Sequence, residues 1–443
     1  MLRRIRIQNY KSLRAVDVEL QPLSVLFGHN AAGKSNFLDA LQLLARIVSS
    51  RSLTKACEPS CPGHPLELLP IGPEGIEHRA GQAAASFRIE ADIELSHHTV
   101  ARVRDEIRDL GGAGDGDGAE GRPREEASGR QYLRERLLRY AIEVEVIPRM
   151  RVLRLLDESL SALRQDGELK QSRNPFAERV GQKVHLRPET QSHPLQFRVG
   201  IDHAIISRPL YAPHYPHLLA AKYELQSWRL VDLDPRECMR AARAPREARH
   251  VGPAGQDLVA FLNTLQATDP GEFEAIEQRV REITPRVRGL RLSTDRLGNV
   301  ELSVVESDSG AVVPGRLLSE GTLRVIGLMA ATSAAGQPGL IGLEEPENGI
   351  HPHQIERVAG QLTDRARSGS AQLVITTHSP VLLDQIPPDH LYVVRRPAEG
   401  TRISRFTPWG NLAAAPQIRD YLCDPLEADG NSGRGGDHAA DDE

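Results

Sequence analysis

The chain has few cysteines and no long hydrophobic run. Only four of its 443 residues are cysteine, and their scattered positions exclude a disulfide framework. No apolar stretch approaches the roughly 18 residues that a membrane-spanning helix needs. The charged start, residues 1–7, lacks the apolar core of a signal peptide. We therefore expect a globular cytoplasmic protein that makes no membrane contact.

Two groups of residues have a spacing that metal sites also show, but neither favours a metal. Cys57, Cys61 and His64 form Cys-x₃-Cys-x₂-His, which lacks a fourth ligand and lies in a loop rich in proline and glycine. Asp115 and Asp117 lie in a glycine tract, which gives them no rigid frame. Reduced thiols and a solvated loop are the interpretations we prefer.

The formal net charge of −5 is concentrated at the C-terminal end. Residues 424–443 carry seven acidic side chains and one arginine, so the rest of the chain is close to neutral. Net charge therefore gives no argument for a nucleic-acid partner, and a local basic face cannot be located from the sequence.

Apolar periodicity predicts an α/β chain with an antiparallel part between its two ends. A long surface loop is expected at residues 54–82, and residues 214–285 turn helical without the sustained heptads of a coiled coil. The strands are expected at residues 3–8, 16–20, 24–27, 85–95, 140–147, 151–157, 183–187, 196–201, 287–306, 340–343, 372–376, 391–395 and 402–406. The clearest helices are expected at residues 36–44, 257–265, 273–283, about 320–335, and 353–368.

A phosphate-binding loop is the strongest motif in the sequence. Residues 28–35 fit G-x-x-x-x-G-K-[ST] and lie between a short apolar strand and a helical pattern. Backbone N–H groups and the helix N-terminus would face the phosphates, Lys34 would add a charge and Ser35 a hydroxyl for Mg²⁺. The alternative is a glycine-rich turn that only opens a helix. The expected nucleotide-binding residues are Gly28, His29, Asn30, Ala31, Ala32, Gly33, Lys34, Ser35 and Asn36.

Two adjacent carboxylates follow the apolar strand at residues 340–343. Ligands of open α/β sheets bind at such strand ends. Glu344 would hold Mg²⁺, and Glu345 would orient and polarise the water that attacks the γ-phosphate. Glu347 is a poorer candidate and is interpreted as structural. A solvated acidic turn is the alternative for this stretch.

Two further motifs have weaker local signals. His378 follows the buried strand at residues 372–376 and could hydrogen-bond the γ-phosphate or the attacking water, with Thr377 in support. The stretch Ser319-Glu320-Gly321 lies at a helix start, where it could present an anion site. On its own, however, this stretch indicates only a helix cap.

These four motifs, in this order, resemble the ABC-type ATPases of the SMC/RecF/OLD group, which are often grouped with the AAA ATPases. Residues 7–13 are also similar to the first hairpin of that group. The resemblance covers residues 1–50 and 310–395, and only loosely the 200 or so residues between them. It implies a P-loop ATPase head with an antiparallel β lobe, a mixed α/β core sheet and an inserted helical region.

The resemblance implies how the chain is divided. The segments expected are the N-terminal half of the ATPase domain at 1–50; a β-rich lobe at 51–213, disordered at about 105–130; a helical insert at 214–286; the C-terminal half of the ATPase domain at 287–410; and a C-terminal segment at 411–443 that ends in an acidic tail.

The resemblance also implies ATP and Mg²⁺ as cofactors and a homodimer as the working form. The signature Ser319, Glu320 and Gly321 would then act in trans on ATP held by the partner's phosphate loop, and hydrolysis would reopen the dimer. Glu345 and His378 would be catalytic, and Ser35 and Glu344 would hold the metal.

The sequence departs from the family pattern in four ways. Glu344 stands where the family usually has Asp, and the Gln-bearing loop cannot be placed, the region around Ser86 being only a guess. The long coiled-coil arms are missing. Residues 384–443 show no Toprim nuclease arrangement of carboxylates on strands.

The main hypothesis is therefore an ATPase whose dimerisation regulates DNA or a separately encoded effector, in anti-phage defence or DNA repair. A nucleotide-gated scaffold with little hydrolysis is the first alternative. The ATPase subunit of a membrane transporter is disfavoured, because the 200-residue insert is larger than a compact transporter subunit requires.

Overall fold

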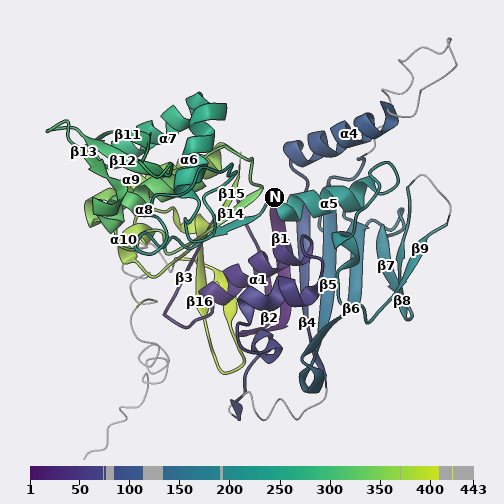
Figure 1. Cartoon of the computed structure of the whole chain (residues 1–443). Coiled ribbons are helices and arrows are strands. Elements are labelled where there is room, and N and C mark those ends of the chain that lie inside the picture. Colours follow the sequence, from purple (N-terminus) through teal and green to yellow (C-terminus); the bar gives the residue numbers. More distant parts are fainter. Residues whose placement is uncertain are drawn as a thin grey trace, which may run out of the picture.

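A computed structural model describes residues 1–72, 74–75, 84–112, 133–189, 193–369, 371–408 and 422. Asp115, Asp117 and the acidic tail lie outside these residues. In the described part, two large sheets lie side by side and meet where β17 (Arg402–Arg405) contacts β2 (Leu13–Glu19) (Figure 1). The fold is the mixed α/β class that the sequence predicts.

The first large sheet has six strands and provides the frame for the site. Its order is β10 (Arg229–Val231), β14 (Leu340–Glu344), β15 (Gln372–Thr377), β3 (Leu23–Phe27), β16 (Leu391–Arg395) and β17. All neighbouring pairs are parallel except β16 and β17. The strands expected at 24–27, 340–343, 372–376, 391–395 and 402–406 are thus confirmed, within a residue or two at their ends.

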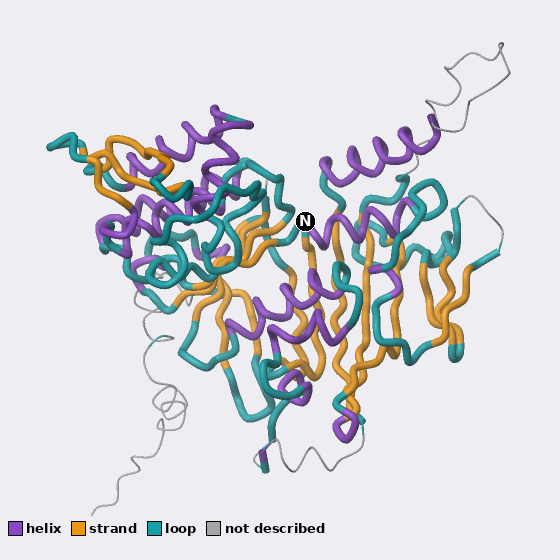
Figure 2. The backbone as a smooth tube through the Cα atoms, in the orientation of Figure 1, coloured by secondary structure: helices purple, strands orange, loops and turns teal. Residues whose placement is uncertain are grey.

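Helices cover both faces of this sheet, so its strands are apolar on both sides. Leu26 packs in one core with α1 (Lys34–Ile47) and α5 (Pro216–Gln226), whereas its neighbours Val25 and Phe27 pack in the other. That second core contains α6 (Leu258–Thr268), α7 (Pro270–Ile283), α8 (Glu320–Ala331) and α9 (Pro352–Arg367). Figure 2 shows helices and strands packed together in this part of the molecule.

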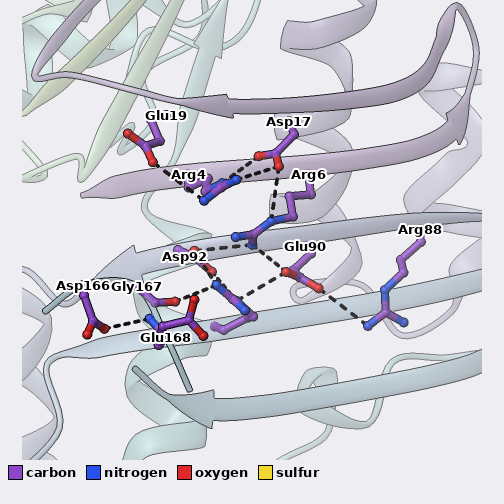
Figure 3. A network of polar contacts seen from close by, with 11 residues as sticks. Arg4, Arg6, Asp17, Glu19, Arg88, Glu90, Asp92, Asp166, Gly167 and Glu168 are labelled. Atoms are coloured by element: carbon purple, nitrogen blue, oxygen red, sulfur yellow. Dashed lines mark hydrogen bonds and ion pairs between the residues drawn. The ribbon is translucent and has the colours of Figure 1, made fainter. Parts of the chain in front are cut away.

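The second large sheet has eight antiparallel strands. Its order is β2, β1 (Leu2–Tyr10), β4 (Ala85–Glu94), β5 (Leu137–Ile147), β6 (Val152–Ala162), β7 (Ala177–Val180), β8 (Lys183–Leu186) and β9 (Leu195–Arg198). Ile5 and Ile7 point into the core with α1. On the opposite face, Arg4 and Arg6 of β1 pair with carboxylates of neighbouring strands (Figure 3). This alternation is that of a half-buried sheet, as the sequence predicts.

A small third sheet packs on α6 and α7. It consists of β11 (Val287–Thr294), β12 (Val300–Glu306) and β13 (Val312–Pro314). Gly298 lies in the turn between β11 and β12 with a φ of 83°, which confirms the predicted hairpin. None of the helices in the described residues is long and apolar enough to cross a membrane.

Three expectations were wrong in part. Residues 53–68 are not a surface loop: α2 (Leu53–Cys57) and two short 3₁₀ turns, η1 (Glu58–Ser60) and η2 (Pro65–Leu68), bury Ala56 and Leu66. The stretch from residue 105 to 112 is not disordered but belongs to α4 (His97–Gly112), because Val100, Val103 and Ile107 have helical spacing and are buried. The segment 214–286 is not purely helical, since β10 joins the six-stranded sheet.

Candidate nucleotide-binding site

The parallel strands bring the ends of distant motifs to one edge of the six-stranded sheet. In the register of the sheet, Val231 lies opposite Leu343, Glu344 opposite Thr376, and Thr377 opposite Phe27. The residues that follow these strands therefore share the carboxyl edge, where open α/β sheets bind ligands.

The phosphate loop leaves this edge at the end of β3 and closes at the start of α1. Gly33 is the N-cap of α1 with a φ of 109°, which favours glycine. A Cβ atom on Gly33 would lie 2.2 Å from Thr401 Oγ1, and one on Gly28 would lie 2.2 Å from the carbonyl oxygen of Val394. Both glycines of the motif are thus required by their neighbours. The loop tip, Asn30 and Ala31, is exposed.

Two hydroxyl residues that the motif does not contain support this loop. Thr401 Oγ1 lies 2.8 Å from both the carbonyl oxygen of Ala32 and Ser12 Oγ. Asn36 Nδ2 donates to Ser12 Oγ at 2.8 Å. Ser12 belongs to the hairpin that the resemblance singled out, but no sequence signal marked Thr401 as part of the loop.

Lys34 lies beneath the loop with its side chain buried. Its Nζ donates to the carbonyl oxygens of Gly28 at 2.7 Å and His29 at 2.9 Å. Burial lowers the pKa of Lys34, whereas the carboxylates of Glu345 and Glu344 raise it. The lysine is therefore the cation that faces the acidic side of the site.

Ser35 and Glu344 join the two halves of the site directly. The Ser35 hydroxyl donates to Glu344 Oε1, although the residues are 309 positions apart in the chain. Burial raises the pKa of Glu344, and the hydrogen bond from Ser35 only partly opposes that effect. A buried carboxylate with a raised pKa is stabilised by a cation.

The oxygen atoms of Ser35 and Glu344 are ligands of the kind Mg²⁺ prefers. Within the described residues, no group of three or more His, Cys, Asp or Glu side chains could hold a metal ion by itself. The pair of oxygen donors from Ser35 and Glu344 fits Mg²⁺, which usually takes one or two protein ligands and completes its shell with phosphate oxygens and water.

Glu345 and His378 form a second pair at the same edge. His378 Nδ1 lies 2.8 Å from Glu345 Oε1, and Asn348 Nδ2 donates to Glu345 Oε2 at 2.8 Å. The φ of Glu345 is 41°, an uncommon backbone conformation for a residue with a side chain. Burial raises the pKa of Glu345, but the hydrogen bonds from Asn348 and His378 outweigh it and the pKa is lowered. The adjacent glutamates thus have opposite shifts, which suits different roles.

Glu347 and Thr377 form a hydrogen bond with each other. Glu347 is 5% exposed and accepts a hydrogen bond from the Thr377 hydroxyl. Thr377 Oγ1 also accepts from the backbone N–H of Ser379 at 2.9 Å. The structural interpretation of Glu347 fits these contacts, whereas a direct support of His378 by Thr377 is not observed among them.

Asp232 is a carboxylate at this edge that sequence reasoning missed. It follows β10, one residue beyond the pair formed by Val231 and Leu343. Burial raises the pKa of Asp232, Arg324 lowers it, and its charge in turn raises the pKa of Glu344. A strand of three residues is too short to show a period, so the sequence offered no strand to which Asp232 could be assigned.

The signature residues lie at the start of α8. Ser319 is the N-cap of α8, and its Oγ accepts from the backbone N–H of Thr322 at 3.2 Å. Ser319 and Glu320 are exposed. A Cβ atom on Gly321 would lie 2.6 Å from the carbonyl oxygen of Gly349, in the turn that follows Glu345. The helix start therefore packs against the carboxylate turn, with its cap facing solvent.

The residues with the spacing of a metal site, and Ser86, make contacts within the fold. His64 Nδ1 accepts from the backbone N–H of Leu66 at 3.0 Å, and Cys61 Sγ lies 3.1 Å from the carbonyl oxygen of Cys57. Burial raises the pKa of Cys61 to about 11, so this thiol is neutral at neutral pH. Ser86 lies in β4 with its hydroxyl on Glu143, within the antiparallel sheet.

Two family models match the chain, one at each side of the antiparallel lobe. Residues 1–60 match a model described as "AAA ATPase domain". Residues 211–384 match a model described as "AAA domain, putative AbiEii toxin, Type IV TA system". These two segments contain the phosphate loop and the three later motifs. No curated protein matches the chain.

Solved structures of SMC head domains have a similar course of the chain. An Smc head bound to the C-winged helix domain of ScpA has a TM-score of 0.48 and 13% identity, over 91% of this chain and 97% of that one. The SMC head domain from Thermotoga maritima has a TM-score of 0.40 and 12% identity, over 92% of this chain and 99% of that one. A third structure is an Smc head with an extended coiled coil, bound to the C-terminal domain of ScpA derived from Pyrococcus furiosus. It has a TM-score of 0.45 and 11% identity, over 96% of this chain and 98% of that one.

TM-scores below 0.5 carry no conclusion about function, so the assignment depends on the family models and the motifs. The narrower likeness to OLD and RecF proteins stays a prediction. Models of AAA domains thus match two segments of the chain, residues 1–60 and 211–384, in the order that the motifs predict.

Proposed function

We propose that the protein binds and hydrolyses ATP and that ATP joins two copies of the chain. The observation that carries this proposal is the hydrogen bond between Ser35 of the phosphate loop and Glu344 of the carboxylate strand. This bond brings a phosphate-binding motif and a pair of acidic side chains to one sheet edge. A glycine-rich turn that merely opens a helix would have no reason to face two carboxylates.

In this proposal the phosphate loop and Lys34 bind the β- and γ-phosphates. Glu345, whose pKa is lowered by its hydrogen bonds from Asn348 and His378, is ionised at neutral pH as an ordinary glutamate is, so it can accept a proton from the attacking water. His378 Nδ1, 2.8 Å from Glu345, fixes the direction of that carboxylate and can contact the γ-phosphate side. Mg²⁺, held by Ser35 and Glu344, would neutralise phosphate charge.

The dimer is supported by the exposed signature. Ser319 and Glu320 face solvent at the N-terminus of α8, and the hydrogen bonds of Ser319 stay within that helix start. A helix N-terminus attracts anions. The γ-phosphate of a nucleotide held by a second copy is an anion that could reach it. ATP would then bind between two copies and stabilise their contact.

The first experiment measures ATP binding and phosphate release by the purified protein with Mg²⁺. We expect Lys34→Ala to weaken ATP binding by roughly 10- to 100-fold, because a charge-assisted contact to phosphate is lost. The control is Glu356→Gln, an exposed glutamate on α9. Unchanged ATP affinity in Lys34→Ala would contradict the proposed nucleotide site.

The second experiment tests the dimer and separates hydrolysis from a scaffold role. Glu345→Gln should bind ATP, stop turning over and accumulate as a dimer in sedimentation or light scattering. A wild-type protein that releases phosphate no faster than Glu345→Gln would instead be the nucleotide-gated scaffold. Ser319→Arg, at the exposed cap, should prevent the dimer while ATP still binds to the monomer.

The biological role that we propose is control of DNA or of a separately encoded effector protein by this dimer, in the cytoplasm. The family model at residues 211–384 names a toxin of a Type IV toxin–antitoxin system, which supports a place in defence. Proteins that co-purify with Glu345→Gln in the presence of ATP, and not with Lys34→Ala, would identify the partner. Co-purification of an integral membrane protein would favour the transporter alternative.

A further inference from the structure

A pocket of about 260 Å³ lies at the end of α1 opposite to the phosphate loop. The last turn of α1, strand β10, the segment from Arg249 to Pro253 and the C-terminal end of α8 line it. Trp228, Val251 and Phe261 give it an apolar wall. Its volume lies just below the range of roughly 300–1,000 Å³ that is usual for ligand sites, so an occupant would be small.

The charged side chains that line this pocket are all arginines. The described lining residues include Arg46, Arg229 and Arg249 but no Asp or Glu. Arg46 is engaged elsewhere, with Nε on the carbonyl oxygen of Ala56 at 2.9 Å. Arg249 is 84% exposed at the rim and pairs with Glu247 at 3.6 Å. Arg229 is therefore the cation that the pocket itself contains.

Arg229 has no counter-ion among the described residues. Its Nε is buried and has no hydrogen-bond partner there, and the same holds for Nε1 of the neighbouring Trp228, which is 5% exposed. Unpaired buried donors are rare in native proteins. Burial and the charge of Arg229 lower the pKa of His250, so this imidazole is neutral at neutral pH and adds no charge to the pocket. The pocket thus combines one uncompensated guanidinium with apolar walls.

A guanidinium binds carboxylate and phosphate groups through its planar fork, and apolar walls bind an apolar body. We propose that this pocket binds a small organic anion, with a carboxylate or phosphate on Arg229 and a ring or aliphatic body against Trp228 and Phe261. A second part of the proposal, which depends on the proposed function, is that the anion changes the affinity for ATP.

Three elements connect the pocket to the nucleotide site. α1 runs from the pocket to Lys34, and α8 runs from it to Ser319. β10 carries Arg229 opposite Ile341 at one end and leads to Asp232 beside Glu344 at the other. An anion bound to Arg229 would act on a strand whose far end is at the carboxylates. By linkage, each ligand would change the affinity for the other by the same factor.

The binding test uses Trp228 as its reporter. The chain has two tryptophans, so Trp409→Phe leaves Trp228 alone, and Lys34→Ala in the same protein removes anion binding at the phosphate loop. The probes are benzoate and phenyl phosphate, compared with neutral benzyl alcohol and cationic benzamidine. We expect saturable fluorescence changes with the two anions only. The stronger of the two identifies a carboxylate or a phosphate as the preferred group.

The variant test uses two arginines. Arg229→Gln should weaken binding of the anionic probes about tenfold or more, because a charge-assisted contact is lost. Arg243→Gln, an exposed arginine outside the lining, should leave it unchanged. Equal binding of benzyl alcohol or benzamidine, unchanged binding in Arg229→Gln, or no binding of either anion at tens of millimolar would overturn the proposal.

The coupling is tested by ATP binding in the protein with Lys34 intact. Benzoate should change the ATP dissociation constant by about twofold or more in the wild type and not in Arg229→Gln. An unchanged constant with benzoate bound would overturn the coupling and leave the binding site standing. Failure to bind ATP without any probe would instead overturn the proposed function, so the two failures are distinguishable.

Discussion

The two large sheets both carry charged side chains, but they surround them differently. On the polar face of the antiparallel sheet, carboxylates are paired with arginines: Arg4 lies 2.6 Å from Asp17 (Figure 3), and Arg139 lies 2.6 Å from Asp92. At the carboxyl edge of the parallel sheet, Glu344 accepts a hydrogen bond from the Ser35 hydroxyl and is paired with no arginine among the described residues. The first arrangement satisfies its charges within the protein, whereas the second leaves negative charge for a ligand to balance.

The pKa directions follow this difference. The hydrogen bond from Arg4 lowers the pKa of Asp17, although burial opposes it. Burial raises the pKa values of Glu344, Glu347 and Asp232. Glu344 and Asp232, whose pKa values are raised by burial at the carboxyl edge of the parallel sheet, are candidates for function, and the carboxylates that are paired with arginines are structural. The comparison therefore predicts which substitutions affect activity and which affect stability.

The largest expected effect is on turnover. Glu345→Gln should lower kcat for ATP hydrolysis by roughly 10²- to 10⁴-fold, because a general base is lost, and should leave ATP binding intact. The matched substitution on the other sheet is Glu90→Gln, a glutamate held by Arg6 at 2.6 Å. It should leave kcat unchanged within twofold of the wild type. Steady-state phosphate release measures both variants, and comparable losses would contradict the comparison.

The second effect is on stability and concerns the ion pairs between arginines and carboxylates on the antiparallel sheet. Arg139→Gln removes the ion pair with Asp92, which is 3% exposed, and leaves that carboxylate with Arg6 at 3.4 Å. We expect the free energy of unfolding to fall by roughly 1–3 kcal/mol, because a buried charge is less well paired. Denaturant titration measures it. A variant as stable as the wild type, or one that loses ATP affinity while folded, would show that these ion pairs do not serve stability alone.

The third effect concerns Asp232, which the comparison places with the functional carboxylates. Asp232→Asn should raise the Mg²⁺ concentration for half-maximal turnover by about two- to tenfold, because one negative charge beside Glu344 is lost. Asp157→Asn, on the antiparallel sheet beside Arg88, is the control and should not alter the Mg²⁺ dependence. The same Mg²⁺ dependence in Asp232→Asn and the wild type would remove Asp232 from the site.

Much of this site was predictable because its signals are local. The phosphate loop is a contiguous motif between a strand and a helix, and Glu344, Glu345 and His378 each follow an apolar strand that the sequence shows clearly. The parallel register then brings these ends together, as open α/β sheets generally do.

The parts that sequence reasoning missed depend on contacts between distant segments. β10 has three residues, too few for a period, and becomes a strand only through its pairing with β14. Thr401 supports the phosphate loop from 369 positions away, at the carbonyl oxygen of Ala32. The sequence predicts disorder from about residue 105, near the glycine tract that begins at the end of α4. Its apolar side chains, such as Ile107, are buried only in the folded chain.

The smallest expected effect is on the pH dependence of protein stability, to which Glu347 and Asp17 contribute with opposite signs. The pKa of Glu347 is raised in the folded state, so the folded protein binds more protons than the unfolded one above pH 4.5, and stability falls as pH rises toward the raised value. The Glu347→Gln variant keeps an acceptor for Thr377. Its free energy of unfolding, measured relative to that of the wild type, should therefore be higher at pH 7 than at pH 4.

Asp17 has the opposite sign, because its pKa is lowered in the folded state. Its contribution is present above the usual aspartate pKa and is lost as pH falls through the lowered value. Asp17→Asn should thus destabilise the protein at pH 7 by at most about 1 kcal/mol, since the pair with Arg4 is half exposed, and by less near pH 3. Melting temperatures at several pH values measure both variants. If the difference in melting temperature from the wild type changed with pH in the same direction for both variants, the two carboxylates would not differ in environment as the comparison requires.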